Sequence, residues 1–143
     1  MKYPLAALLG RARATFIGEC ETRLAAAGYG DLAISHGTNI LRHLREGESM
    51  RVADLVRASG VTKQAISQQL AYLEAHGYVV VDLDERDRRG KTVRPTAQGV
   101  ASNRTIRGIF GEVHRDWRAR YGDERMQNLF DTLTDITGLE AAD

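Results

Sequence analysis

Apolar residues recur at steps of three and four along most of the chain, a period that predicts amphipathic helices. A first helix is expected after Pro4 and ends near Gly28, and a second is expected from Ser35, its N-cap, to just before Gly47. The apolar stripe of the first helix consists of Leu5, Leu9, Ala12, Phe16, Cys20 and Leu24.

Two shorter helices are expected next, joined by a tight turn. The first covers Val52–Ala58 and stops at Gly60, and the second is capped by Thr62 and closed by Gly77. The second helix has an apolar stripe at i, i+4 and i+7, formed by Ile66, Leu70 and Leu73. Such a pair is a helix-turn-helix, whose second helix fits the major groove of DNA.

After this pair the hydrophobic period changes to that of a β-hairpin. Tyr78–Val81 is β-prone, a charged loop covers Asp82–Lys91, and Thr92–Arg94 returns as a second strand. Two final helices are expected, one capped by Thr96 and one by Asp123. The chain is therefore predicted to be mainly α with a small β-hairpin wing, a winged helix-turn-helix with an element order of ααααββαα.

Length and charge refine this prediction. The 143 residues are 43% hydrophobic and 27% charged, which suits one globular domain over residues 1–143. The net charge of +1 hides a basic patch, since Arg86–Arg94 holds five basic residues and one acidic residue. The stretch Asp123–Asp143 holds six acidic residues and one basic residue. A local basic patch is what phosphate binding requires.

The cysteine content and the apolar runs point to a cytoplasmic protein. Cys20 is the only cysteine, so the chain forms no internal disulfide and fits a reducing compartment. The apolar run at Pro4–Gly10 lacks the order of a signal peptide, and no run approaches the ~20 residues of a membrane span.

The second helix of the pair carries polar side chains suited to reading DNA. Lysine reaches phosphates or guanine, glutamine pairs with adenine in a bidentate manner, and serine serves several bases. The candidate recognition residues are Thr62, Lys63, Gln64, Ser67, Gln68 and Tyr72. A solvated helix face explains the same residues, so the helix alone does not decide.

The tip of the hairpin is the second candidate site. Arginines on a narrow projection enter a minor groove or contact phosphates. The candidate wing residues are Arg86, Asp87, Arg88, Arg89 and Lys91. A soluble tip of mixed charge is the alternative, but a helix-turn-helix followed directly by a basic hairpin is a winged helix.

At these residues the chain resembles the multiple-antibiotic-resistance regulator (MarR) family. Thr62–Ser67 and Leu73–Val79 resemble the recognition helix and its exit, and Asp84–Gly99 resembles the wing. The wing contains the Asp-x-Arg signature at Asp87 and Arg89 and the Thr-x-x-Gly that opens the next helix. Pro95 stands where the family usually has an apolar residue, so we expect the second strand to end early.

The resemblance implies a homodimer that binds palindromic double-stranded DNA. Residues 31–96 would be the DNA-binding lobe, and residues 1–30 and 97–143 the dimerisation helices. Arg89 would enter the minor groove and Asp87 would orient it. The function implied is a repressor released by a small aromatic effector, whose candidate cleft residues are Phe16, His36, His43 and Trp117.

Three alternatives remain beside this reading. Some relatives sense peroxide through a cysteine near the start of the first helix, whereas Cys20 lies well along the apolar stripe. A winged-helix module that binds protein instead of DNA fits the low net charge. An enzyme is disfavoured, because the sequence has no phosphate loop and no nucleophile beside a base. We expect no metal and no cofactor, since the four histidines lack metal-ligand spacing.

Overall fold

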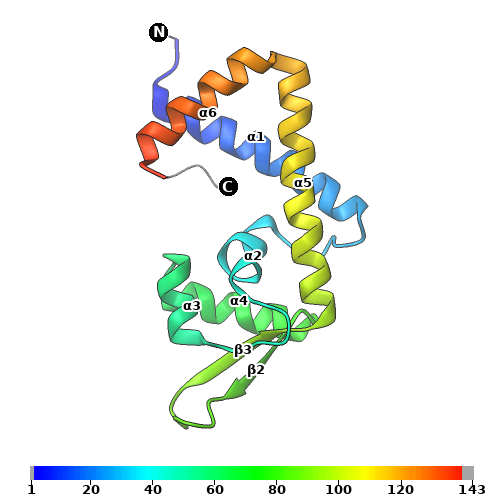
Figure 1. Cartoon of the computed structure of the whole chain (residues 1–143), viewed down its shortest axis with the longest axis vertical. Helices are drawn as coiled ribbons and strands as arrows, with labels where there is room; N and C mark the ends of the chain where they lie inside the picture. The colour runs from blue at the N-terminus through cyan, green and yellow to red at the C-terminus, as the bar shows by residue number, and fades with distance from the viewer. Residues whose placement is uncertain (1, 140–143) are drawn as a thin grey trace. The chain divides into compact units, whose positions relative to one another are not determined.

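The computed structural model of the chain describes residues 2–139, drawn in Figure 1. The chain divides into two compact units, Met1–Ile109 and Phe110–Asp143. The long helix α5 (Ala97–Tyr121) contributes residues to both units. Met1 and residues 140–143, at the ends of the two segments predicted to dimerise, lie outside the described residues.

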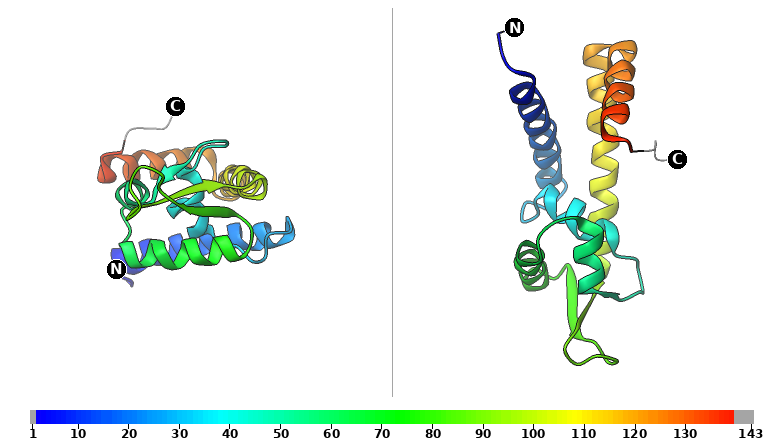
Figure 2. Two further views of the ribbon diagram at one scale, coloured as in Figure 1. Left: turned by 90° about the horizontal axis from the view of Figure 1, so that it is seen from below. Right: turned by 90° about the vertical axis from the view of Figure 1, so that its left-hand side faces the viewer.

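The first unit is a helical lobe with a small antiparallel sheet, which confirms the predicted winged-helix fold class. Its elements follow the order α1 (Leu5–Ala26), α2 (Ile34–Asn39), η1 (Leu41–His43), β1 (Met50–Arg51), α3 (Val52–Ser59), α4 (Lys63–Ala75), β2 (Val79–Leu83) and β3 (Lys91–Pro95). The sheet order is β1-β3-β2. The hairpin of β2 and β3 projects beyond α3 and α4 (Figures 1 and 2).

The predicted caps of the helix-turn-helix are present. The Thr62 hydroxyl accepts a hydrogen bond from the Ala65 N–H at 3.2 Å, and Gly60 ends α3 with a φ of 69°. Gly77 follows α4 with a φ of 82°, a left-handed conformation that favours glycine. Local residue chemistry therefore sets both ends of α4.

Three expectations about element boundaries were wrong. The second helix begins after Ala33 instead of Ser35, because the His36 Nδ1 accepts the Ala33 N–H at 3.0 Å. It stops at Asn39, and Ile40, with a φ of −126°, separates it from the short helix η1. The last helix has Gly122, not Asp123, at its N-cap position.

The wing contains a third strand and a longer hairpin than expected. β1 pairs with β3 at Met50↔Val93 and Arg51↔Thr92. β3 runs through Pro95, which pairs with Val79, so the expected early end of the strand was wrong. β1 pairs only with Thr92 and Val93, so β3 has an open edge at Pro95, where a missing N–H donor costs little.

The core of the lobe joins the helix-turn-helix to the sheet and to α5. Leu55 of α3, Ile66 and Leu73 of α4, Val93 of β3 and Ile106 of α5 are almost fully buried. Gly99 allows α5 to approach the sheet, since a Cβ there would clash with the backbone carbonyl oxygen of Tyr78. The Thr-x-x-Gly motif therefore has a packing reason, with the Thr96 hydroxyl accepting the Gly99 N–H at 3.1 Å.

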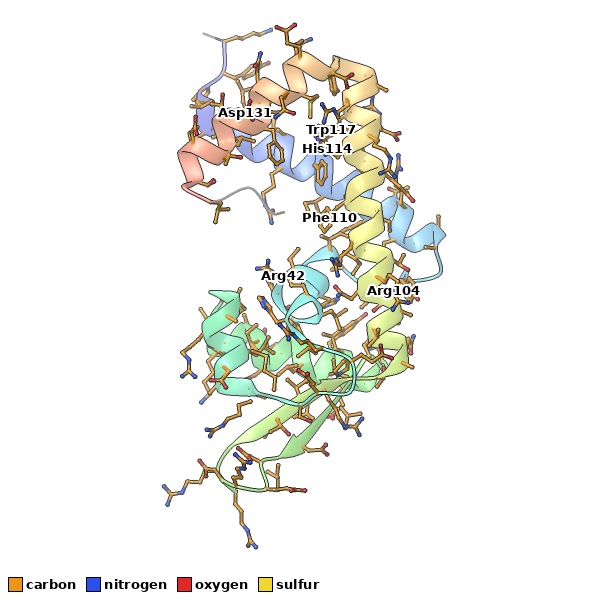
Figure 3. All side chains as sticks on the ribbon, in the orientation of Figure 1. Arg42, Arg104, Phe110, His114, Trp117 and Asp131 are labelled. Atoms are coloured by element: carbon orange, nitrogen blue, oxygen red, sulfur yellow. The ribbon has the colours of Figure 1, made fainter. Side chains whose placement is uncertain are left out.

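The second unit consists of the end of α5 and α6 (Asp123–Thr137). The His114 and Phe130 rings stack with centroids 6.0 Å apart. Figure 3 shows Phe110, His114 and Trp117 on one side of α5. α6 has no buried residue, and four of its exposed side chains are large and apolar: Leu129, Phe130, Leu133 and Ile136.

Within residues 2–139, every helix is too short or too polar to cross a membrane.

Candidate nucleic-acid interface

The two faces of α4 differ sharply in exposure. Ile66 and Leu73 are fully buried and Leu70 is 5% exposed, so one face of the helix is fixed against the lobe. The opposite face is open to solvent and is polar. Its exposed residues include Lys63, Gln64, Ser67 and Gln68. Four of the six predicted recognition residues therefore share an accessible helix face, with Thr62 serving as the N-cap.

The tip of the wing is also exposed. Asp84 is the one loop residue of the tip with a buried side chain, whereas all five predicted wing residues are exposed. Long side chains with terminal nitrogens extend outward from this end of the hairpin in Figure 3. The excess of arginine makes the tip electropositive.

A hollow of about 470 Å³ joins the two predicted sites. Lys63 and Ser67 of α4 line one part of it, and Arg89 and Lys91 of the wing line another. The remaining lining residues are Val52, Ala53 and Val56 of α3 and Gly90 of the wing. Residues that are more than twenty positions apart in the sequence thus form one cationic surface, shared by α4 and the wing.

The wing loop has an internal network of carboxylates. Asp87 Oδ1 accepts the backbone N–H of Arg89 at 3.0 Å, and Asp87 Oδ2 lies 3.6 Å from Nη2 of Arg51. Asp84 Oδ2 lies 3.3 Å from Nε of the same arginine. Asp87 therefore contacts the backbone of Arg89, while its ion-pair partner is Arg51, a residue that sequence reasoning missed.

The geometry can be compared with known proteins. Residues 38–90 match the model of the MarR family. The transcriptional activatory protein BadR of Rhodopseudomonas palustris is 37% identical over 96 residues, which cover 64% of this chain. Over the segment that holds α3, α4 and the start of the wing, the chain is therefore similar to the MarR family. It spans 55% of the length of BadR.

Solved structures of MarR-type proteins share the fold. The reduced form of MarR from E. coli matches with a TM-score of 0.78 and 19% identity, over 95% of this chain and 98% of that chain. S. aureus MepR in a DNA complex matches with a TM-score of 0.76 and 18% identity, over 96% and 98%. A mutant E. coli MarR complexed with operator DNA matches with a TM-score of 0.75 and 19% identity, over 93% of each chain.

Tyr72 differs from the other predicted recognition residues in its contacts. Its hydroxyl donates to the backbone carbonyl of Asp31, and its ring stacks between His36 and His76. The centroid distances are 4.9 Å to His36 and 4.0 Å to His76. The Tyr78 hydroxyl donates to the Asp31 carboxylate at 2.6 Å. Tyr72 thus links α4 to α2 and does not line the hollow.

The candidate effector residues are divided between the two units. Phe16, His36 and His43 lie in the first unit, and Trp117 lies in the second. His36 is held by the Tyr72 stack and the Ala33 N–H. Nε2 of His43 is a buried ring nitrogen without a hydrogen-bond partner. Burial lowers the pKa of both histidines and so favours the neutral form of both rings.

Cys20 has the environment of a structural side chain. It is fully buried on α1, and burial raises the pKa of its thiol to about 11. The thiolate is the reactive form, so the raised pKa favours the less reactive thiol at neutral pH. No cluster of three or more His, Cys, Asp or Glu side chains suited to a metal occurs within residues 2–139.

Proposed function

We propose that the chain is a sequence-specific transcription regulator that binds double-stranded DNA as a homodimer. The observation that carries this proposal is the hollow shared by Lys63 and Ser67 of α4 and by Arg89 and Lys91 of the wing. A helix in the major groove and a wing on the flanking minor groove would each contact DNA from this surface. The S. aureus MepR–DNA complex and the E. coli MarR mutant complexed with operator DNA have the same fold.

The exposed residues of α4 suit base readout. Gln64 and Gln68 present amide groups that pair with adenine N6 and N7, and Lys63 reaches a guanine edge or a phosphate. Arg89 and its neighbours on the wing supply charge for phosphates and for a narrow minor groove. In this proposal α4 selects the sequence and the wing supplies much of the affinity.

A homodimer accounts for exposed apolar side chains that a monomer leaves in water. α1 exposes Leu5, Leu8 and Leu9, and α6 exposes four more large apolar residues. These helices lie in the segments 1–30 and 97–143 that we propose as dimerisation regions. Two-fold symmetry would present two copies of α4 to half-sites ~34 Å apart, which requires a palindromic operator.

We further propose that the protein represses transcription and that a small aromatic effector releases it. A dimer that covers an operator overlapping a promoter blocks access of the polymerase. An effector that binds one spacing of the recognition helices better than the other would shift the population away from the DNA-binding form. The unpartnered Nε2 of His43 offers a hydrogen bond to such an effector.

The first test is DNA binding itself. Duplexes bound by the full chain are selected from a random library, and the affinity of the enriched site is measured by fluorescence anisotropy at several salt concentrations. We expect a palindromic site, two chains per duplex and a steep fall of affinity with salt. Failure to enrich any sequence would leave the protein-interaction module as the better reading.

The Arg89→Ala variant tests the wing on the enriched site. Loss of one arginine contact is expected to weaken binding by roughly 5- to 150-fold. The slope of log affinity against log salt concentration should become shallower by about one. Arg45→Ala, at an exposed position outside both the hollow and the proposed dimerisation segments, is the matched control. Equal affinity of Arg89→Ala and the unmodified protein would remove the wing from the interface.

The direction of regulation is tested with a reporter gene behind the enriched site. Repression predicts low expression that rises when an aromatic effector is added. BadR is named an activatory protein, so expression that rises with the regulator alone would contradict repression while leaving DNA binding intact.

A further inference from the structure

One arginine outside the β2–β3 hairpin contacts both acidic residues that organise the wing loop. Arg51 lies in β1, where it pairs with Thr92 of β3. Its Nε is 3.3 Å from Asp84 Oδ2, and its Nη2 is 3.6 Å from Asp87 Oδ2. Nη2 also lies 3.5 Å from the point where a Cβ on Gly90 would be. The guanidinium therefore lies against the loop and bridges the two carboxylates.

The second oxygen of each carboxylate binds the loop backbone. Asp84 Oδ1 accepts the Arg86 N–H at 3.0 Å, and Asp87 Oδ1 accepts the Arg89 N–H at 3.0 Å. The Gly90 N–H donates to the Asp87 carbonyl at 2.8 Å, and the Asp84 N–H donates to the Gly90 carbonyl at 2.9 Å. The backbone at Arg86 and at Arg89 is thus connected to Arg51 through one carboxylate each.

The electrostatics of the cluster require the arginine. The Asp84 side chain is 11% exposed, and a carboxylate so nearly buried needs an opposite charge. Both carboxylates would also repel DNA phosphates if they were not compensated. The planar fork of arginine holds two carboxylates at once, whereas lysine offers a single point charge.

We propose that Arg51 is a positioning residue for DNA binding, which acts through Asp84 and Asp87 to fix the wing loop that carries Arg89. This inference rests on the proposed function, because it concerns how the wing meets DNA. The Arg51 side chain is 54% exposed, yet its polar atoms face the two carboxylates. Without Arg51 the loop would keep its arginines, but the loop backbone would no longer hold their side chains in a defined orientation.

The state of the loop in the free protein is the first measurement. Hydrogen exchange of the Arg86 and Arg89 amides is followed by NMR in the unmodified protein and in Arg51→Gln. We expect faster exchange of these two amides in the variant, with the amides of α4 unchanged. Arg57→Gln, which removes an arginine that pairs with Asp54 on α3, is the matched control. Equal exchange of the loop amides in Arg51→Gln would overturn the proposal.

DNA affinity of Asp84→Asn separates positioning from simple charge. This substitution removes a negative charge near DNA, so a purely electrostatic role predicts tighter binding. The positioning role predicts the opposite, a loss of roughly tenfold, because the ion pair with Arg51 is gone. Glu85→Gln, which removes the same charge from an exposed neighbour in the loop, is expected to bind as tightly as the unmodified protein or tighter.

Arg51→Lys separates positioning from a direct contact with DNA. A lysine keeps the charge for a phosphate contact but loses the fork that bridges two carboxylates. We expect Arg51→Lys to bind DNA as weakly as Arg51→Gln, and binding equal to that of the unmodified protein would overturn the inference.

Different experimental outcomes would overturn this inference and the proposed function. No specific DNA binding by the unmodified protein would remove both. Specific binding by the unmodified protein, together with equal or tighter binding by Asp84→Asn, would overturn the positioning role alone.

Discussion

At the scale of single residues, the glycine of the Thr-x-x-Gly motif has a structural reason, because the backbone of α5 lies very close to that of Tyr78 there. A Cβ at Gly99 would clash with the Tyr78 carbonyl oxygen, while a Cβ at Gly108, further along α5, would meet nothing within 4 Å. This carbonyl belongs to the backbone directly before β2, where it accepts the Thr96 N–H, so it cannot rotate away. The same substitution at the two sites should therefore have opposite effects on stability.

We predict that Gly99→Ala lowers the free energy of unfolding by about 1–3 kcal/mol, because the overpacked contact must be relieved by moving α5 or the sheet. Gly108→Ala should raise it by about 0.5–1 kcal/mol, because alanine loses less backbone entropy than glycine in a helix. Urea denaturation of both variants measures the difference. A Gly99→Ala variant as stable as the unmodified protein would contradict the packing argument.

The ring stack at Tyr72 gives the lobe a pH-dependent contact. Burial lowers the pKa of His36, and the neighbouring His76 lowers it further, while Asp31 and Glu21 act in the opposite direction. The neutral ring is also the form whose Nδ1 accepts the Ala33 N–H. Since the folded pKa lies below the ordinary value of 6.5, the unfolded chain binds more protons between the two values.

We therefore predict that His36 contributes stability above pH 6.5 and that this contribution is lost as the pH falls through its lowered folded pKa. Thermal unfolding between pH 5 and 8 tests this expectation. His36→Gln keeps an acceptor for the Ala33 N–H but does not titrate, so its midpoint should fall less toward acid than that of the unmodified protein. A parallel fall in both proteins would exclude His36 as the source.

At the scale of elements, local signals predicted the helix-turn-helix well and distant contacts were missed. The period of Ile66, Leu70 and Leu73 and the cap at Thr62 are contained within one helix, so the sequence shows them directly. The break at Ile40 and the two-residue strand β1 leave no period to detect. Arg51 meets Asp84 only because β1 pairs with β3, a contact that the sequence pattern does not encode.

The N-cap of α4 is the element-scale prediction. Thr62→Ala removes the acceptor for the Ala65 N–H at the start of α4 and should cost about 1 kcal/mol of stability. Thr62→Ser keeps the hydroxyl and should cost little. Chemical denaturation of the two variants gives the comparison, and an equal loss in both would mean that the methyl group of Thr62, not its hydroxyl, matters.

At the scale of the whole molecule, the exposed apolar residues make the oligomeric state the deciding property. Leu5 is 64% exposed on α1, and Ile136 is 70% exposed on α6. Single exposed apolar residues are ordinary on a protein surface, but rows of them along two helices are not. The proposed dimer would bury both rows. Binding to a palindrome would then depend on α1 and α6, which lie in other parts of the sequence than α4 and the wing.

We predict that Leu9→Asp combined with Ile136→Asp converts the dimer to a monomer, because each substitution puts a charge into an apolar interface. Sedimentation measures the mass, and anisotropy on the palindromic site measures the affinity. A monomer contacts one half-site, so affinity should fall at least 100-fold, by roughly the 3 kcal/mol or more that one half-site supplies. Leu83→Gln, at a 66% exposed wing position, is the control for lost apolar surface and should remain dimeric. A double variant that stays dimeric would mean that other surfaces hold the two copies together.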